Sequence, residues 1–257
     1  PVMALSDELS ALADLLLEIV LAFAARAVWG GEPEAPRGFA VIGYGKLGGK
    51  ELGYGSDLDI VFLFDETAER EPEKLARLSQ RANTWLSSMT SAGVLYETDL
   101  RLRPDGAAGL MVTSLEAFRD YQEKRAWTWE HQALTRARFC AGDRALGVRF
   151  EALRREVLAK PRDGAKLREE IAAMRAKMRA EVKADPRDLK HVAGGVVDLE
   201  FAVQALVLAE SHRHPPLLDN KGNHALLRRA GEMGILEPGL AAAAADAYLA
   251  LRARTHA

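Results

Sequence analysis

The first third of the chain contains two short apolar runs, which are separated by glycine-rich sequence. Residues 39–42 form the first run and residues 58–64 form the second. After Asp59 the second run has no polar residue, which is typical of a strand buried on both faces. The pattern therefore predicts two buried strands joined by a glycine-rich loop.

A third stretch, residues 93–104, alternates between two kinds of side chain. One face of an extended chain would carry Val94, Tyr96, Thr98, Leu100 and Leu102. The other face would carry Leu95, Glu97, Asp99, Arg101 and Arg103. This period of two predicts a half-buried strand with a polar face. After a turn at residues 104–106, we expect residues 110–113 to form a return strand.

Apolar positions spaced three and four residues apart predict helices in the remaining sequence. Near the N-terminus we expect a helix at residues 6–29, with Ser6 as its N-cap, and a second helix at residues 73–91. Beyond Ser114 we expect no further strand. We expect helices at residues 115–124, 127–139 and 143–158. A long helix should follow, with Leu167, Ile171, Met174 and Met178 on one stripe. The last helices are expected at residues 197–211, at residues 220–230 and from residue 240 to the end.

The sequence Pro161-Arg162-Asp163-Gly164 interrupts this pattern. An α/β unit of about 160 residues precedes it, and an all-helical unit follows. A chain of 257 residues is long enough for two modest domains, each with its own core. We therefore expect domains at residues 1–160 and 161–257.

Composition excludes several classes of protein. The formal net charge is −2, so the chain lacks the overall basic field of a nucleic-acid-binding protein. Its single cysteine, Cys140, excludes an internal disulfide and is typical of a reducing compartment. The apolar residues 15–25 include Glu18 and are too few to span a bilayer, so we expect a cytoplasmic protein without a membrane partner. Both ends of the chain look like cuts from a longer polypeptide.

The loop between the two buried strands carries the candidate chemistry. It ends in Gly55-Ser56 and places Asp57 and Asp59 at the start of the second strand. Side chains two apart in a strand share a face, about 7 Å apart at the backbone, and unpaired burial of both carboxylates would be costly. Mg²⁺ prefers such oxygen ligands together with phosphate. The loop therefore predicts a magnesium site where the Gly-Ser backbone approaches a nucleotide triphosphate.

A two-metal site needs a third carboxylate, and Asp99 is the candidate because it lies on the polar face of the next predicted strand. The alternative is an ion pair between Asp99 and Arg101 or Arg103. These arginines either bind the triphosphate or neutralise Glu97 and Asp99. Lys46 either contacts a phosphate or is simply exposed to solvent. The predicted metal-binding and catalytic residues are Asp57, Asp59 and Asp99, and the predicted nucleotide-binding residues are Gly55, Ser56, Lys46, Arg101 and Arg103.

The loop also fits the fingerprint of a Rossmann dinucleotide-binding domain. A G-x-G-x-x-G motif at residues 43–48 follows a strand, and Asp65 lies at about the right distance to bind a ribose. The fingerprint requires a helix after its third glycine. Three further glycines by residue 55 would each cost about 1 kcal/mol relative to alanine in that helix. We therefore rank this interpretation below a nucleotidyltransferase.

We expect several other charged residues and the cysteine to have structural roles. We expect Glu51 to have a structural role. Glu130, Arg136 and Arg138 have helical spacing and are expected to form surface or inter-helix salt bridges. Cys140 is expected to be a small buried apolar residue.

Four motifs of the chain are long and specific: residues 43–64, residues 95–104 (LYETDLRLRP), residues 127–134 (WTWEHQAL) and residues 194–201 (GGVVDLEF). They resemble those of the bacterial glutamine synthetase adenylyltransferase family, a branch of the DNA polymerase β-like nucleotidyltransferase superfamily. The resemblance extends over nearly the whole chain from Gly38 onward. It implies an α+β nucleotidyltransferase fold, with a short mixed sheet flanked by helices and followed by an all-helical C-terminal domain.

Members of this family carry two such catalytic halves, one adding AMP to a tyrosine of glutamine synthetase and one removing it. The motifs at residues 43–45 and 127–130 resemble the adding, C-terminal half; the alternatives are the removing half and a non-catalytic regulatory module. The resemblance implies Mg²⁺-dependent transfer from ATP, with Asp57 and Asp59 binding metal and Asp99 drawing the tyrosine proton. It also implies glutamine synthetase as protein substrate and a PII-type signalling protein as a partner of the full-length chain.

Overall fold

The computed structural model describes residues 2–68, 71–182, 185, 187–219 and 221–255. These residues form two compact units. The first, which we call the sheet unit, contains residues 6–126 and 136–154; the second, the helical unit, takes its described residues from 2–5, 127–135 and 155–255. These units describe packing, and the predicted domain boundary between residues 160 and 161 stays a prediction.

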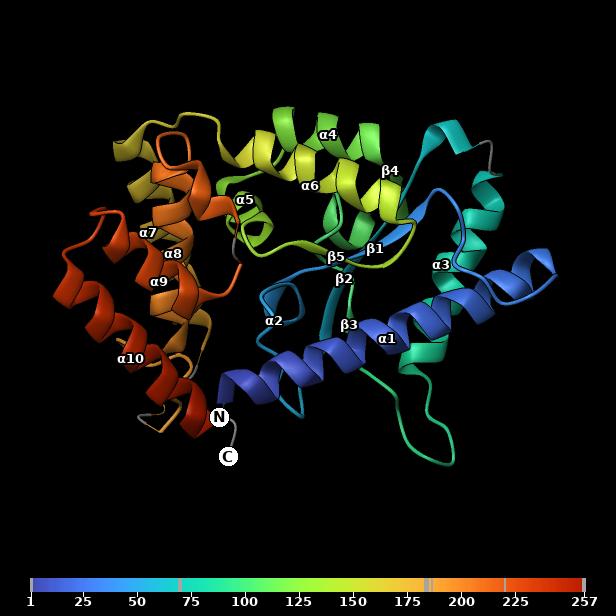
Figure 1. Cartoon of the computed structure of the whole chain (residues 1–257), viewed down its shortest axis with the longest axis horizontal. Coiled ribbons are helices and arrows are strands. Elements are labelled where there is room, and N and C mark those ends of the chain that lie inside the picture. The colour runs from blue at the N-terminus through green and yellow to red at the C-terminus, as the bar shows by residue number, and fades with distance from the viewer. Residues whose placement is uncertain (1, 69–70, 183–184, 186, 220, 256–257) are drawn as a thin grey trace. The chain divides into compact units, whose positions relative to one another are not determined.

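A five-stranded mixed sheet forms the centre of the sheet unit (Figure 1). Its strands are β1 (Phe39–Gly43), β2 (Leu58–Phe64), β3 (Thr98–Asp99), β4 (Val112–Ser114) and β5 (Arg138–Gly142). The order is β3-β2-β1-β5, and β4 also pairs with β2. β1 is antiparallel to both β2 and β5, whereas β3 and β4 run parallel to the start and the end of β2. The predicted α+β class with a short mixed sheet is confirmed.

Helices cover both faces of this sheet (Figure 1). They are α1 (Val2–Trp29), the one-turn α2 (Gly45–Gly48), α3 (Pro72–Ser87), α4 (Leu115–Lys124) and α6 (Arg144–Leu158), with short 3₁₀ turns η1 (Glu66–Ala68) and η2 (Gly106–Ala108). Leu17 of α1 and Leu78 of α3 share one apolar core with Phe62 of β2. On the other face α4 packs on β2, and the ring of Phe118 of α4 contacts that of Phe150 of α6 in a tilted arrangement, with centroids 6.0 Å apart.

The N-terminal helix begins earlier than the sequence predicts. Ser6, expected as its N-cap, lies inside α1 and is fully buried. Ser10 one turn later donates its hydroxyl proton to the Ser6 carbonyl at 2.7 Å, so polar side chains are satisfied within the helix. The predicted boundary was wrong because Ser6 is enclosed by packing instead of capping a free end.

The alternating stretch at residues 93–104 is much less extended than predicted. Only Thr98 and Asp99 pair as a strand, and the backbone turns immediately afterwards. The Asp99 carboxylate accepts the backbone N–H of Arg101 at 2.8 Å, which bends the chain away from the sheet. The strand predicted at residues 110–113 exists as β4, displaced by one to two residues, but it is not a return strand, because it pairs with β2 and runs in the same direction as β3.

The expectation of no strand after Ser114 was also wrong. The helix predicted at residues 127–139 ends at Leu134 as α5 (Thr128–Leu134), and the chain enters the sheet unit as β5. There Ala141 pairs with Val41 and Phe139 pairs with Ile42 of β1. Pairing with β1 buries Cys140 and Ala141, and this tertiary partner was not visible in the local sequence.

The helical unit consists of five α-helices among its described residues, as the prediction of an all-helical C-terminal region requires. Besides α5 they are α7 (Gly164–Glu181), α8 (Val196–Glu210), α9 (Asn223–Glu232) and α10 (Pro238–Thr255), with a 3₁₀ turn η3 (Pro215–Leu218). The expected helix start at Asn220 and the last two residues of the chain lie outside the described residues. Among the described helices, none has the length and apolar character needed to cross a membrane.

Candidate functional site

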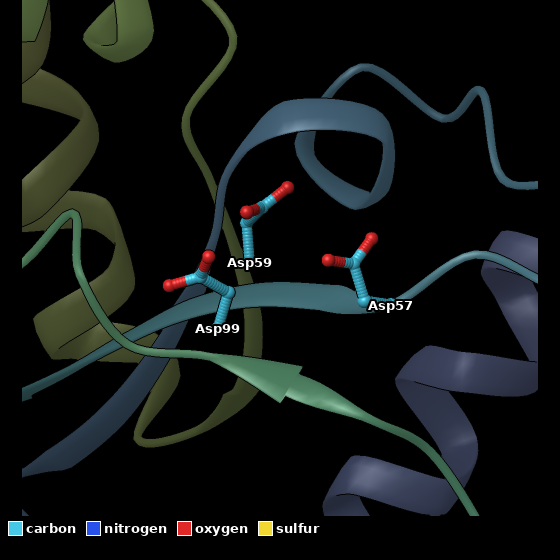
Figure 2. Close-up of side chains that lie close together, drawn as sticks. All are labelled: Asp57, Asp59 and Asp99. Carbon is cyan, nitrogen blue, oxygen red and sulfur yellow. The ribbon is translucent and has the colours of Figure 1, made fainter. Parts of the chain in front are cut away.

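Three carboxylates meet where β2 and β3 pair. Asp57, Asp59 and Asp99 each offer a carboxylate oxygen within 4.8 Å of the others. Figure 2 shows the three side chains on the same side of the two strands. Asp59 lies directly opposite Asp99 in the parallel register, so their side chains are cross-strand neighbours. The sequence predicted these residues as one set, and the fold brings all three together.

Backbone pairing holds the two strand starts in place. The N–H of Leu58 donates to the carbonyl of Glu97 at 2.9 Å, and the N–H of Tyr44 donates to the carbonyl of Asp59 at 2.8 Å. The Thr98 hydroxyl donates to Oδ1 of Asn83 on α3 at 2.7 Å. Asn83 is not recognisable from the sequence, because a polar residue in an amphipathic helix gives no sign of its tertiary partner.

The carboxylates differ in their electrostatic surroundings. Burial, followed by the charges of Asp57 and Asp99, raises the pKa of Asp59 to about 6, against the opposing charges of Lys46 and Arg136. Hydrogen bonds from the Arg101 side chain lower the pKa of Asp99 instead. A carboxylate whose charge is disfavoured by neighbouring acids gains most from a bound cation. All the clustered ligand atoms are oxygens, the ligands that Mg²⁺ prefers, so the residues present fit this metal.

Glycine at position 45 allows the loop to lie against this cluster. Gly45 has φ +52°, and a Cβ there would lie 2.1 Å from Oδ2 of Asp59. Gly45 therefore combines a left-handed backbone with a contact too close for any side chain. The same turn carries Lys46, whose charge acts on Asp59.

The predicted Gly-Ser turn follows a few residues later. Ser56 accepts the backbone N–H of Gly53 at 2.9 Å, which leaves its hydroxyl proton as a donor. A Cβ at Gly55 would meet no atom within 4 Å. Protein packing therefore does not require glycine at this position.

The two candidate arginines are held differently. Arg101 is exposed and donates from Nε to Oδ2 of Asp99 at 2.9 Å, so the ion pair considered from the sequence exists beside the carboxylate cluster. Arg103 donates instead to the carbonyls of Leu100, Ala107 and Gly109 at 2.8, 3.0 and 3.2 Å. These bonds hold together the loop that follows β3.

Two other arginines contradict the expectation of surface or inter-helix salt bridges. Arg136 is 4% exposed and pairs with Glu51, which is fully buried. Arg138 lies in β5 and donates to both carboxylate oxygens of Asp14, at 2.7 and 2.9 Å. The alternation of Arg136 and Arg138 before the apolar residues 139–141 is a strand signal that could have indicated this arrangement.

Three further residues have identifiable structural roles. Glu130 accepts the backbone N–H of Trp127 at 2.8 Å and so caps the start of α5. Cys140 is buried as predicted, and burial raises the pKa of its thiol. In the helical unit Asp198 accepts the N–H of Gly194 at 2.7 Å and pairs with Arg175 at 2.6 Å.

Comparison with known proteins agrees with this picture. A family model described as glutamate-ammonia ligase adenylyltransferase matches residues 1–153. The bifunctional glutamine synthetase adenylyltransferase/adenylyl-removing enzyme of Aromatoleum aromaticum is 58% identical over 254 residues. The enzymes of the same name from Chromobacterium violaceum and Nitrosomonas europaea are 53% and 54% identical.

These matches cover 98% of this chain but only 27 to 28% of the relatives. The chain thus spans about a quarter of the length of the curated relatives it matches. Their similarity is far above what a shared fold alone produces. Together, the family model and these relatives show that the chain belongs to the glutamate-ammonia ligase adenylyltransferase family.

Proposed function

We propose that this chain transfers AMP from ATP to a tyrosine hydroxyl of glutamine synthetase in a Mg²⁺-dependent reaction. The single observation that carries the proposal is the cluster of Asp57, Asp59 and Asp99 beside the glycine turn. The relatives are named as glutamine synthetase adenylyltransferases, which supports the choice of protein substrate. The tyrosine and the direction of transfer rest on the motif resemblance.

In this mechanism Asp57, Asp59 and Asp99 would hold Mg²⁺. The bound cation would offset the negative charge of the phosphates and lower the pKa of a nearby hydroxyl. The tyrosine oxygen attacks the α-phosphorus of ATP, a new P–O bond forms, and the bond to pyrophosphate breaks. Asp99 accepts the tyrosine proton, so that its carboxylate is neutralised as the pyrophosphate leaves. Charge develops on the departing pyrophosphate and requires fixed donors.

Several residues could supply those donors. Lys46 lies on the turn next to Asp59, the Ser56 hydroxyl retains its proton, and Arg101 is exposed beside Asp99. We assign these three, with the backbone at Gly55, to phosphate binding. The three carbonyl bonds of Arg103 favour a role in holding the loop between β3 and η2, instead of direct phosphate contact.

The direction of the reaction is the main alternative. The relatives' name includes adenylyl removal, and the same carboxylates serve either direction. A Rossmann domain is disfavoured, because residues 49–57 form turns and irregular backbone where that fold needs a helix. Regulation by a PII-type protein, which the resemblance implies, would act through the full-length polypeptide.

Incubation with labelled ATP, Mg²⁺ and glutamine synthetase tests the proposal. Transfer of label by the native chain, and a loss on the order of 100-fold or more in folded Asp57→Asn and Asp59→Asn variants, would support it. Asp120→Asn is the matched control, since Asp120 is an exposed acid that pairs with Lys124 on α4. Wild-type turnover in either site variant would refute the metal assignment. AMP release from adenylylated glutamine synthetase, without forward transfer, would assign the removing direction.

A further inference from the structure

A buried ion pair supports the glycine turn from within the sheet unit. Arg136 lies between α5 and β5, and Glu51 lies three residues after α2. Nη2 of Arg136 donates to Oε2 of Glu51, with exposed fractions of 4% and 0% for the two side chains. Burying both charges is costly unless they pair, so each side chain depends on the other for its position.

The Arg136 residue is in direct contact with the backbone of the turn. A Cβ at Gly49 would lie 2.4 Å from Nη2 of Arg136, and a Cβ at Gly48 would lie 2.0 Å from the Arg136 carbonyl oxygen. The backbone contact excludes any side chain at Gly48, and a side chain at Gly49 would displace the Arg136 guanidinium. Glu51 is also tied to the turn, because its N–H donates to the carbonyl of Lys46 at 2.7 Å.

The first residue of the same turn lies against the carboxylate cluster. At Gly45 a Cβ would overlap Oδ2 of Asp59, at 2.1 Å. The turn at residues 45–49 therefore packs against Asp59 at its first residue and against Arg136 at its end. Such tight packing transmits a displacement of the arginine directly to the acid.

We propose that Glu51 and Arg136 are positioning residues. They hold the turn at residues 45–49 in contact with Asp59 and so fix the position of Lys46 relative to the nucleotide. This inference rests on the proposed function for its nucleotide. Neither side chain needs to touch substrate. Partners that orient ligand-bearing groups in this way typically change affinity or activity by 10- to 100-fold when replaced.

A purely structural ion pair makes a different prediction. It would lower thermal stability when lost but leave the KM for ATP unchanged in any variant that still folds. A positioning pair affects the KM for ATP in folded protein. The Glu51→Gln variant keeps the shape of the side chain and one acceptor oxygen but removes its charge. The double variant Glu51→Leu/Arg136→Met removes both charges together, so that neither is left buried alone.

The experiment measures the KM for ATP and kcat of AMP transfer, the melting temperature and amide hydrogen exchange in the native chain and these variants. We expect roughly a tenfold or larger rise in the KM for ATP in both, and faster exchange confined to residues 45–49. Arg136→Lys, which keeps the charge but not the planar fork, should restore part of the loss.

Arg154→Met is the matched control, because Arg154 is an equally buried arginine that pairs with Glu151 within α6. It should lower the melting temperature and leave the KM for ATP unchanged. A KM for ATP and an exchange rate at residues 45–49 that both match the native chain in folded Glu51→Gln would overturn the inference. If the native chain shows no AMP transfer, the proposed function fails, whereas the exchange measurement still decides whether the pair holds the turn.

Discussion

At the scale of single residues, the site places three negatively charged side chains close together. Asp59 is the most enclosed member of its set, since burial and two neighbouring carboxylates disfavour its charge. The pKa of Asp99 is lowered instead, because the Arg101 side chain donates hydrogen bonds to its carboxylate. A cation would therefore act chiefly on Asp59, the residue that the strand places between the other two.

This difference predicts how Mg²⁺ stabilises the protein at different pH values. The pKa of Asp59 is about 6 in the metal-free fold, above its ordinary value of 3.8. Since the folded state holds this proton more tightly, the contribution of Asp59 to stability falls as pH rises from about 4 to about 6. Above pH 6 the carboxylate is charged and ready for a cation. We expect Mg²⁺ to raise the melting temperature more at pH 8 than at pH 5.

Thermal unfolding with and without Mg²⁺ at the two pH values checks this expectation. Asp59→Asn is the control, because an amide does not titrate and the difference between the two pH values should shrink. An equal effect of Mg²⁺ at pH 5 and pH 8 in the native chain would contradict the assignment.

A second residue-scale prediction concerns Gly45. In Gly45→Ala the new methyl group would overlap the Asp59 carboxylate, and the left-handed backbone adds about 1–2 kcal/mol of strain. Gly30→Ala is the matched control, since Gly30 also has positive φ but meets no atom within 4 Å. Both variants should lose stability in denaturant titrations. Only Gly45→Ala should also lose AMP transfer, and equal activity of the two would show that the close contact is unimportant.

At the scale of elements, the site depends on a strand of two residues. Such a short strand has little pairing of its own, so β3 is held by its two neighbours, β2 and α3. The bond from Thr98 to Asn83 provides the link to α3 and lies next to Asp99. Short elements of this kind are fixed by tertiary contacts and are hard to recognise from local pattern.

We therefore expect Thr98→Val, which is nearly the same shape but lacks the hydroxyl, to lower the free energy of unfolding by about 1 kcal/mol. AMP transfer should fall as well, because Asp99 would be less well placed. Thr84→Val is the matched control: the Thr84 hydroxyl donates only to the Gln80 carbonyl on the exposed side of α3. Denaturant titration and the transfer assay measure both effects. Indistinguishable results for the two variants would count against a positioning role for this bond.

At the scale of the whole molecule, packing and chain order do not divide the protein in the same place. The helix α5 precedes β5 in the sequence but packs with α7 and α8, where Gln132 bonds to Gln204 at 3.2 Å. The predicted boundary between residues 160 and 161 would separate α5 from both of these helices. The boundary therefore has a direct experimental test.

A fragment of residues 1–160 would leave the buried face of α5 without partners, so we expect it to melt at a lower temperature than the whole chain. Limited proteolysis should then cut the fragment near residues 127–135 more rapidly. A fragment that melts at the same temperature as the whole chain would instead support a domain boundary at residue 160.

Local sequence determined the two buried strands, most helices and the pairing of Asp57 with Asp59, because alternation and apolar runs follow directly from backbone geometry. It also named Asp99, although the strand predicted around it shrank to two residues. Tertiary structure alone decided three things: that β5 joins the sheet, that Asp99 lies opposite Asp59, and that Arg136 and Glu51 are buried together. Each depends on a partner distant in sequence, and the burial that such a partner provides outweighs local propensity.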